Sequence, residues 1–125
     1  MLTRSQVTTI VPVMDLERAR AFYEGRLGLT PVGRKADGAF EMRAGGASIA
    51  LSPRPEPARN PYTALSFEVA DVAAEVKELT GRGVVFEDYD LPGLKTVNKV
   101  CVLGSERAAW FKDPDGNILC IHQGG

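Results

Sequence analysis

The chain has 125 residues, of which 44% are hydrophobic and 25% charged, and its formal net charge is −1. These values are typical of a globular domain, and both signs of charge are spread along the chain, which argues against a nucleic-acid or membrane partner. No apolar run approaches the ~18 residues of a membrane span, and the two cysteines form no CxxC pattern. We therefore expect a single cytoplasmic domain, residues 1–125, with reduced thiols.

The first half of the chain predicts one strand, one helix and three further strands. Residues 7–13, VTTIVPV, are rich in β-branched side chains and predict the first strand. Asp15 follows at the position of a helix N-cap, and apolar side chains continue at helical spacing as far as Gly28, a residue typical of helix ends. Glycine-containing turns then separate three expected strands, at 29–35, 38–43 and 47–51.

The same series of elements starts again after a proline-rich segment. Residues 52–61, SPRPEPARNP, hold four of the eight prolines and predict an extended connector. A strand is expected at 63–69, Asp71 is a second N-cap, and the GRG sequence at 81–83 ends the second helix. The remaining expected elements are a strand at 84–87 (VVFE), a loop at 88–95 (DYDLPGLK) and strands at about 98–103, 107–112 and 117–122.

The two halves therefore have the pattern of an internal duplication. VMDL at 13–16 matches VADV at 69–72 with an offset of 56, and AGGAS at 44–48 matches PDGNI at 114–118 with an offset of 70. The difference of 14 residues indicates a longer loop in the second half. We predict the α+β class, with two tandem βαβββ modules forming a curved mixed sheet around a cleft and a helix on the outer face of each module. Module one spans about 1–52, the linker about 53–61 and module two about 62–125.

Strand alternation divides the side chains into two sets. The set expected to face the helices is apolar and comprises Thr9, Val11, Val13, Ile49, Leu51, Leu65, Phe67, Val69, Leu119 and Ile121. The opposite set is small and polar and comprises Thr8, Ile10, Pro12, Ser48, Ala50, Ser52, Ala64, Ser66, Glu68, Ile118, Cys120 and His122. This second face either lines a concave ligand site or meets water, and alternation alone favours neither.

Three segments also resemble a known family. VPVMDLERARAFYEGRLGL, FEVADVAAEVKELTGRGV and AAWFKDPDGNILCIHQ resemble the two module starts and the closing hairpin of the vicinal oxygen chelate superfamily. This superfamily includes glyoxalase I, extradiol dioxygenases and bleomycin-resistance proteins. The resemblance implies paired βαβββ modules around a metal-centred cleft. It spans almost the whole chain and is least specific between 84 and 106.

The resemblance also implies where metal ligands would stand. The positions that carry them in the metal enzymes of the superfamily fall on Thr8, Ala50, Ala64 and Cys120. A divalent metal needs several N, O or S ligands that converge on it. One thiol with two alanines and a threonine does not supply them, so we expect no metal at this place and no cofactor.

Few chemically active residues fall on the polar face. The candidates for catalysis are Glu68, His122 and Cys120, each with a simpler alternative: a solvated carboxylate, a histidine at the rim and a small buried filler. Tyr89 and its loop are a candidate lid. Either Trp110 or Phe111 faces the ligand side, and the spacing does not decide which. The predicted ligand-binding residues are Thr8, Glu41, Arg43, Ser48, Ala64, Ser66, Glu68, Trp110, Cys120 and His122.

Two functional hypotheses of different class follow. In the first, the chain is a metal-free protein that binds a small molecule, aromatic or an antibiotic, as the resemblance to bleomycin-resistance proteins implies. In the second, it is an enzyme of the glyoxalase or dioxygenase type, a lyase or isomerase with a relocated metal or none. A third reading is a dimeric interaction protein without a ligand. The two modules and the proline-rich connector lead us to expect a homodimer.

Overall fold

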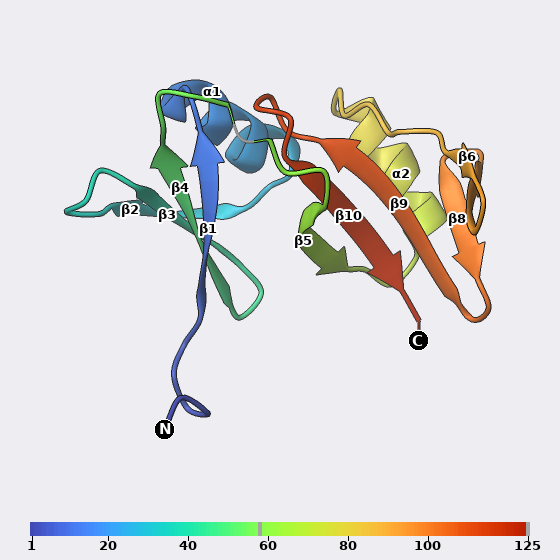
Figure 1. Ribbon diagram of the computed structural model, residues 1–125, viewed down its shortest axis with the longest axis horizontal. Helices are drawn as coiled ribbons and strands as arrows, with labels where there is room; N and C mark the ends of the chain where they lie inside the picture. Colours follow the sequence, from blue (N-terminus) through green and yellow to red (C-terminus); the bar gives the residue numbers. More distant parts are fainter. Residues whose placement is uncertain (58, 125) are drawn as a thin grey trace. The chain divides into compact units, whose positions relative to one another are not determined.

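The computed structural model describes residues 1–57 and 59–124 (Figure 1). Backbone contacts divide the chain into two compact units, Met1–Ala58 and Arg59–Gly125. Each unit has a sheet and one helical segment, which confirms the α+β class. The described helices are all too short to cross a membrane.

The first unit has a four-stranded sheet in the order β1-β4-β3-β2. Its first and last strands run parallel, and the other neighbours are antiparallel. Each predicted element of this half is present within two residues of its expected start and end, except that its helix has two parts. The elements are β1 (Thr8–Val13), α1 (Leu16–Arg20), the π-helix η1 (Ala21–Arg26), β2 (Thr30–Arg34), β3 (Phe40–Ala44) and β4 (Ala47–Pro53).

The second unit has a six-stranded sheet in the order β5-β10-β9-β8-β7-β6. Its elements are β5 (Thr63–Glu68), α2 (Val72–Gly81), β6 (Asp90–Leu91), β7 (Leu94–Val97), β8 (Val100–Leu103), β9 (Glu106–Lys112) and β10 (Ile118–Gln123). Strand β5 runs parallel to β10, as β1 does to β4. The pair Ile10–Ala50 in the first unit corresponds to Ser66–Cys120 in the second, at the offsets of 56 and 70 found in the sequence. The duplication is therefore a duplication of strand pairing.

Two predictions for the second unit are wrong in detail. The expected strand at 84–87 is only an isolated bridge between Phe86 and Phe111, followed by a hydrogen bond from Glu87 N to Trp110 O (2.8 Å). Strand β8 occupies the edge of β9 up to Ala108, so only a short length of that edge is left for this segment. The expected loop at 88–95 instead contains β6 and the start of β7, which pair around a turn with Gly93 at φ +77°. The 14 additional residues thus extend the sheet.

The helix of the first unit differs from the expected single α-helix because it holds one residue more. Asp15 accepts a hydrogen bond from Arg18 N, and Asp71 accepts one from Ala74 N, so both predicted N-caps are confirmed. Gly28 stands 13 positions after Asp15, whereas Gly83 stands 12 positions after Asp71, and both glycines have positive φ. The first helix accommodates its extra residue by widening to a π-helix.

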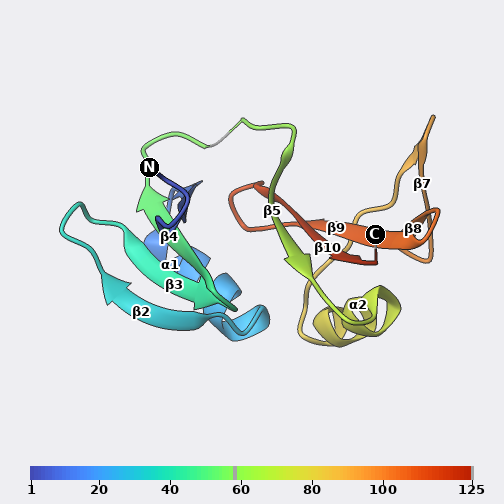
Figure 2. The same cartoon turned by 90° about the horizontal axis from the view of Figure 1, so that it is seen from below.

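Each unit buries most of the predicted apolar face of its sheet, whereas the predicted members Thr9, Leu65, Phe67 and Val69 are only half-buried. In the first, Val11, Met42 and Leu51 are fully buried, and the Arg20 guanidinium lies 3.8 Å from the centre of the Phe40 ring. In the second, α2 contacts β9 and β10 on one face of the sheet (Figure 2). There Leu119, Ile121, Val72 and Phe111 are buried, and the rings of Phe86 and Phe111 meet edge to face at 5.2 Å.

The turn before β10 is held by a buried carboxylate. Asp113 is 5% exposed, and its Oδ1 accepts hydrogen bonds from the backbone N–H groups of Asp115 (2.9 Å) and Asn117 (2.8 Å). Its Oδ2 accepts from Asn117 Nδ2 at 2.7 Å. In the first unit, the exposed Asp37 accepts only one comparable bond, from Ala39 N at 3.0 Å.

We predict that Asp113→Ala lowers the free energy of unfolding by about 2–3 kcal/mol, because it leaves buried donors without an acceptor. The matched control Asp37→Ala removes a turn aspartate whose carboxylate is exposed, and its cost is expected to stay below about 1 kcal/mol. Urea unfolding followed by circular dichroism measures both. Equal losses in the two variants would contradict the assigned role of Asp113.

Candidate functional site

The polar face of the first unit carries a small charged cluster. Strand pairing places Thr8, Ser48 and Arg43 in one row and Ala50 beside Glu41 in the next. Ser48 is only 2% exposed and its hydroxyl donates to Glu41 Oε2 at 2.6 Å, whereas Arg43 Nη2 lies 4.0 Å from the same oxygen. The ion pair is half-exposed and contributes little stability, so the hydroxyl is the better-defined partner of Glu41.

The polar face of the second unit brings together most of the remaining candidates. Ser66, Cys120 and Trp110 form one row across β5, β10 and β9, and Glu68 and His122 lie in the next row. Ser66 Oγ and His122 Nδ1 share a hydrogen bond of 2.6 Å. Glu68 is exposed, and His122 is half-buried. Ala64 lies at an irregularity of the β5–β10 pairing.

The structure decides between Trp110 and Phe111. Phe111 is fully buried against Phe86 on the helix side, so Trp110 lies on the polar face opposite Cys120. Its half-buried indole meets the ring of Tyr89 edge to face, with centroids 5.6 Å apart. Strand alternation predicts that the two side chains face opposite sides of the sheet, but only the pairing of β9 with β10 shows which of them faces the helix.

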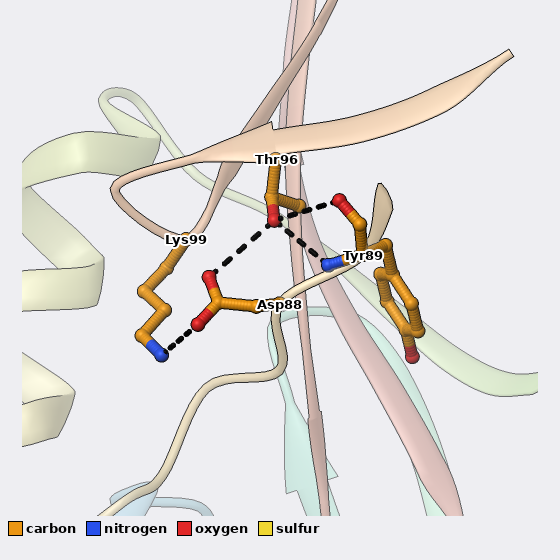
Figure 3. A network of polar contacts seen from close by, with 4 residues as sticks. All are labelled: Asp88, Tyr89, Thr96 and Lys99. Carbon is orange, nitrogen blue, oxygen red and sulfur yellow. Dashed lines mark hydrogen bonds and ion pairs between the residues drawn. The ribbon is translucent and has the colours of Figure 1, made fainter. Parts of the chain in front are cut away.

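Tyr89 is held in place through its backbone. Tyr89 N donates to Thr96 Oγ1 at 2.8 Å, Thr96 N donates to Tyr89 O at 2.9 Å, and Lys99 donates to Asp88 beside them. Figure 3 shows the contacts of the Thr96 hydroxyl and of Lys99, with the Tyr89 ring pointing away from the network. Burial, followed by the negative charge of Glu87, raises the pKa of the Tyr89 hydroxyl, so the phenol stays protonated at neutral pH and can donate a hydrogen bond.

Cys120 has the properties of a buried, protonated thiol. It is 6% exposed and donates to Ile121 O at 3.4 Å. Burial raises the pKa of the thiol, against the weaker opposing effects of hydrogen bonds with Ser66 and with the Ala109 backbone. Cys101 is buried as well, and both cysteines are free thiols. Because the thiolate is the nucleophilic and metal-binding form, this environment disfavours both kinds of chemistry at Cys120.

The four positions that carry metal ligands in enzymes of the resembling family do not fit a metal here. Ala50 and Ala64 have no donor atom, which leaves only the Thr8 hydroxyl and the Cys120 thiol. Among residues 1–57 and 59–124, no three His, Cys, Asp or Glu side chains are grouped so that they could hold a metal ion. We therefore derive no chemistry through a metal.

A concave site also occurs where the sequence did not indicate one. A pocket of about 580 Å³ lies on the helix-bearing face of the six-stranded sheet, and we call it the helix-side pocket. It is lined by Ala73, Lys95, Val97, Asn98, Val100, Val102 and Arg107. None of these residues is among the candidates from the sequence, because the candidates were chosen on the face opposite the helices.

We predict that Cys120 reacts slowly with iodoacetamide in the native chain. With Cys101→Ala removing the other thiol, alkylation at pH 8 should be at least about tenfold slower than in urea. Its pH midpoint should lie above the ordinary thiol value of about 8.5. Because the pKa of the Cys120 thiol is higher in the native chain than in the unfolded one, the free energy of unfolding should also decrease as the pH rises above the ordinary thiol pKa. Rapid native alkylation at neutral pH would contradict the assigned environment; mass spectrometry of peptides measures it.

The comparisons with known proteins agree with this fold. The sequence profile of the Glyoxalase/Bleomycin resistance protein/Dioxygenase superfamily matches residues 5–121. A search of curated proteins gave no match.

Among solved structures, the chain is similar to TnmS3, an antibiotic binding protein from Streptomyces sp. CB03234. The two are 23% identical with a TM-score of 0.71, and the match covers 100% of this chain and 99% of TnmS3. A glyoxalase/bleomycin resistance protein from the same organism is 26% identical, with a TM-score of 0.70 and coverage of 95% and 100%. A glyoxalase/bleomycin resistance protein/dioxygenase from Alicyclobacillus acidocaldarius is 18% identical, with a TM-score of 0.68 and coverage of 96% and 91%. With a profile match that includes both units, the chain belongs to the Glyoxalase/Bleomycin resistance protein/Dioxygenase superfamily.

Proposed function

We propose that the chain is a metal-free protein that binds a small aromatic molecule on the polar face of its six-stranded sheet. The observation that carries this proposal is the position of Trp110. Its indole is half-buried beside Tyr89 and shares a row with Ser66 and Cys120. A flat ligand can stack on an indole or contact its edge, and such contacts contribute about 0.5–1.5 kcal/mol beyond the area that they bury.

Polar groups beside the indole supply orientation. The protonated Tyr89 hydroxyl is a donor, and the hydrogen-bonded pair of Ser66 and His122 can exchange its internal bond for bonds to a ligand. Glu68 lies next to His122 in the sheet and adds a carboxylate. A site with one aromatic surface and a few placed polar groups is typical of small-molecule binding. In the first unit, we assign Thr8, Glu41, Arg43 and Ser48 to the same role, on the polar face of its own sheet.

An antibiotic is the class of ligand that we propose first. TnmS3, which shares the fold at 23% identity, is described as an antibiotic binding protein. The superfamily to which the chain belongs also takes part of its name from bleomycin resistance. A planar aromatic group on such a ligand would suit the edge that Trp110 and Tyr89 form.

An enzyme is the second candidate, and one contact favours it. The bond of 2.6 Å between Ser66 Oγ and His122 Nδ1 joins a hydroxyl to a general base, the arrangement needed for proton transfer. On this reading the chain is a lyase or isomerase in which His122 moves the proton, with Glu68 beside it and no resident metal. Binding is the better-supported proposal because Cys120 is held as a thiol and Glu68 is exposed.

We also propose a homodimer in the cytoplasm. Both cysteines are free, as expected of a reducing compartment. Closed dimers are the commonest oligomers of domains of this size.

We predict that Trp110→Ala weakens ligand binding about tenfold or more. Trp110 is the single tryptophan, so a change in its fluorescence reports the binding of each member of a panel of aromatic and glycopeptide antibiotics. The Trp110→Ala variant lacks this signal, so titration calorimetry measures its affinity. Val85→Ala is the control, because Val85 is 78% exposed and belongs to no strand. The proposal fails if no member of the panel binds or if Trp110→Ala binds as tightly as the unchanged chain.

We further predict that binding does not depend on a divalent metal. Protein purified without chelator should contain well under one Ni, Zn, Mn or Fe per chain by elemental analysis, since two of the four family positions are alanines. The affinity for the ligand found in the panel should be the same before and after dialysis against EDTA. Stoichiometric metal, or loss of binding on chelation with recovery on adding metal back, would favour the enzyme reading.

A further inference from the structure

The helix-side pocket lies on the face opposite Trp110 and belongs entirely to the second unit. Its wall is formed by β7, β8 and the start of β9, with Ala73 of α2 at its edge. Its volume of about 580 Å³ is within the range of small-molecule sites, about 300–1,000 Å³. It contains none of the residues assigned to the proposed function, so a role for this pocket does not depend on that proposal.

The pocket exists because one helix covers only part of a six-stranded sheet. Helix α2 packs on β9 and β10, whereas the additional residues of the second unit extend the sheet through β8 and β7 (Figure 2). The apolar face therefore continues beyond its cover. Val97 is 66% exposed, Val102 is 56% exposed and Val100 is half-buried. Contiguous exposed apolar side chains of this kind mark binding sites more often than single ones do.

The wall of the pocket is fixed by the turn between β7 and β8. Asn98 and Lys99 have φ values of 52° and 72°, the left-handed conformation that a tight two-residue hairpin turn requires. Lys99 donates to Asp88, and the Thr96 hydroxyl contacts both Asp88 and the Tyr89 backbone (Figure 3). The turn is thus tied to the segment before β6, which holds Val97 and Val100 in position.

The charges of the pocket have one sign. Lys95 and Arg107 both line it, and in the part of the chain that the structure describes neither side chain forms an ion pair. The nearest acid in the strand ladder is Asp90, which is opposite Lys95 in the β6–β7 pair, and the ladder neighbours of Arg107 are Val102 and Gln123. Two cations beside an apolar floor complement a ligand with an anionic group and an apolar body.

We propose that the helix-side pocket binds a small organic anion, a carboxylate or sulfonate carried on an aromatic or branched apolar group. The three valines and Ala73 contact the apolar body, while Lys95 and Arg107 bind the anionic group. A second copy of this chain is the less suitable occupant. In a two-fold contact centred on the pocket, each copy would place its Lys95 and Arg107 against those of the other.

The experiment uses 8-anilinonaphthalene-1-sulfonate, whose fluorescence rises in an apolar site, and the uncharged N-phenyl-1-naphthylamine, which has a similar aromatic body. We expect the sulfonate to bind at one site, Lys95→Glu with Arg107→Glu to weaken it at least tenfold, and the uncharged probe to bind more weakly. The control pair Arg34→Glu with Lys35→Glu makes the same change in net charge on exposed residues of the first unit and should leave binding unchanged. Ala73→Phe should block the pocket, and amide shifts in ¹⁵N NMR should cluster at residues 95–102 and 107.

Several results would overturn the proposal. It fails if both charge-reversal pairs weaken the sulfonate equally, if the uncharged probe binds as tightly, or if the amide shifts centre on Trp110 and Ser66. It also fails if the unchanged chain sediments as a dimer that Ala73→Phe converts to a monomer, because a second copy would then cover the pocket. Circular dichroism of each variant checks that it is folded.

Discussion

The parallel pairing of the first and last strand in each unit is the constraint on which the rest of the structure depends. It joins residues that are far apart in sequence, such as Ser66 and Cys120, and it sets which side chains share a face. A shift of one residue in this register would move Leu119 and Ile121 out of the core and Cys120 and His122 into it. The helix is tied to the same strand, since Gln123 of β10 accepts a hydrogen bond from Val72 N at the start of α2. The register, the helix position and the polar face therefore form one arrangement.

The two units show how a duplicated plan becomes asymmetric. Both keep the aspartate N-cap, the positive-φ glycine after the helix and the parallel strand pair. They differ by one residue in the helix, which the first unit takes up as a π-helix, and by 14 residues in the loops, which the second unit uses to widen its sheet. The widening has two effects. It brings Tyr89 to Trp110 on one face and leaves Val97 and Val102 uncovered on the other.

The polar face of the second unit has the framework of a site but a restricted chemistry. Burial raises the pKa of the Cys120 thiol and so makes it a poor nucleophile. What remains on this face is hydrogen bonding, from Ser66, His122 and Tyr89, and one aromatic surface. These groups support the proposed binding of a small molecule, and His122 with the neighbouring Glu68 supports the alternative proposal of an enzyme. Fold and function are thus separable in this chain, because a strand position is kept by packing whichever side chain it carries.

The sequence by itself determined the α+β class, the two βαβββ series, both N-caps and most strand positions, because each depends on local alternation, capping or turn chemistry. The resemblance to the superfamily placed the expected metal-ligand positions on Thr8, Ala50, Ala64 and Cys120, and their residue types are the basis of the proposal that no metal binds there. Only the tertiary structure decided that Phe111 is buried on the helix side and Trp110 lies on the polar face, and that Ser66 forms a hydrogen bond with His122. It also decided that residues 90–97 form a hairpin of two short strands, β6 and β7. Those features depend on pairing between distant segments and on which strands the single helix covers, and neither leaves a local pattern in the chain.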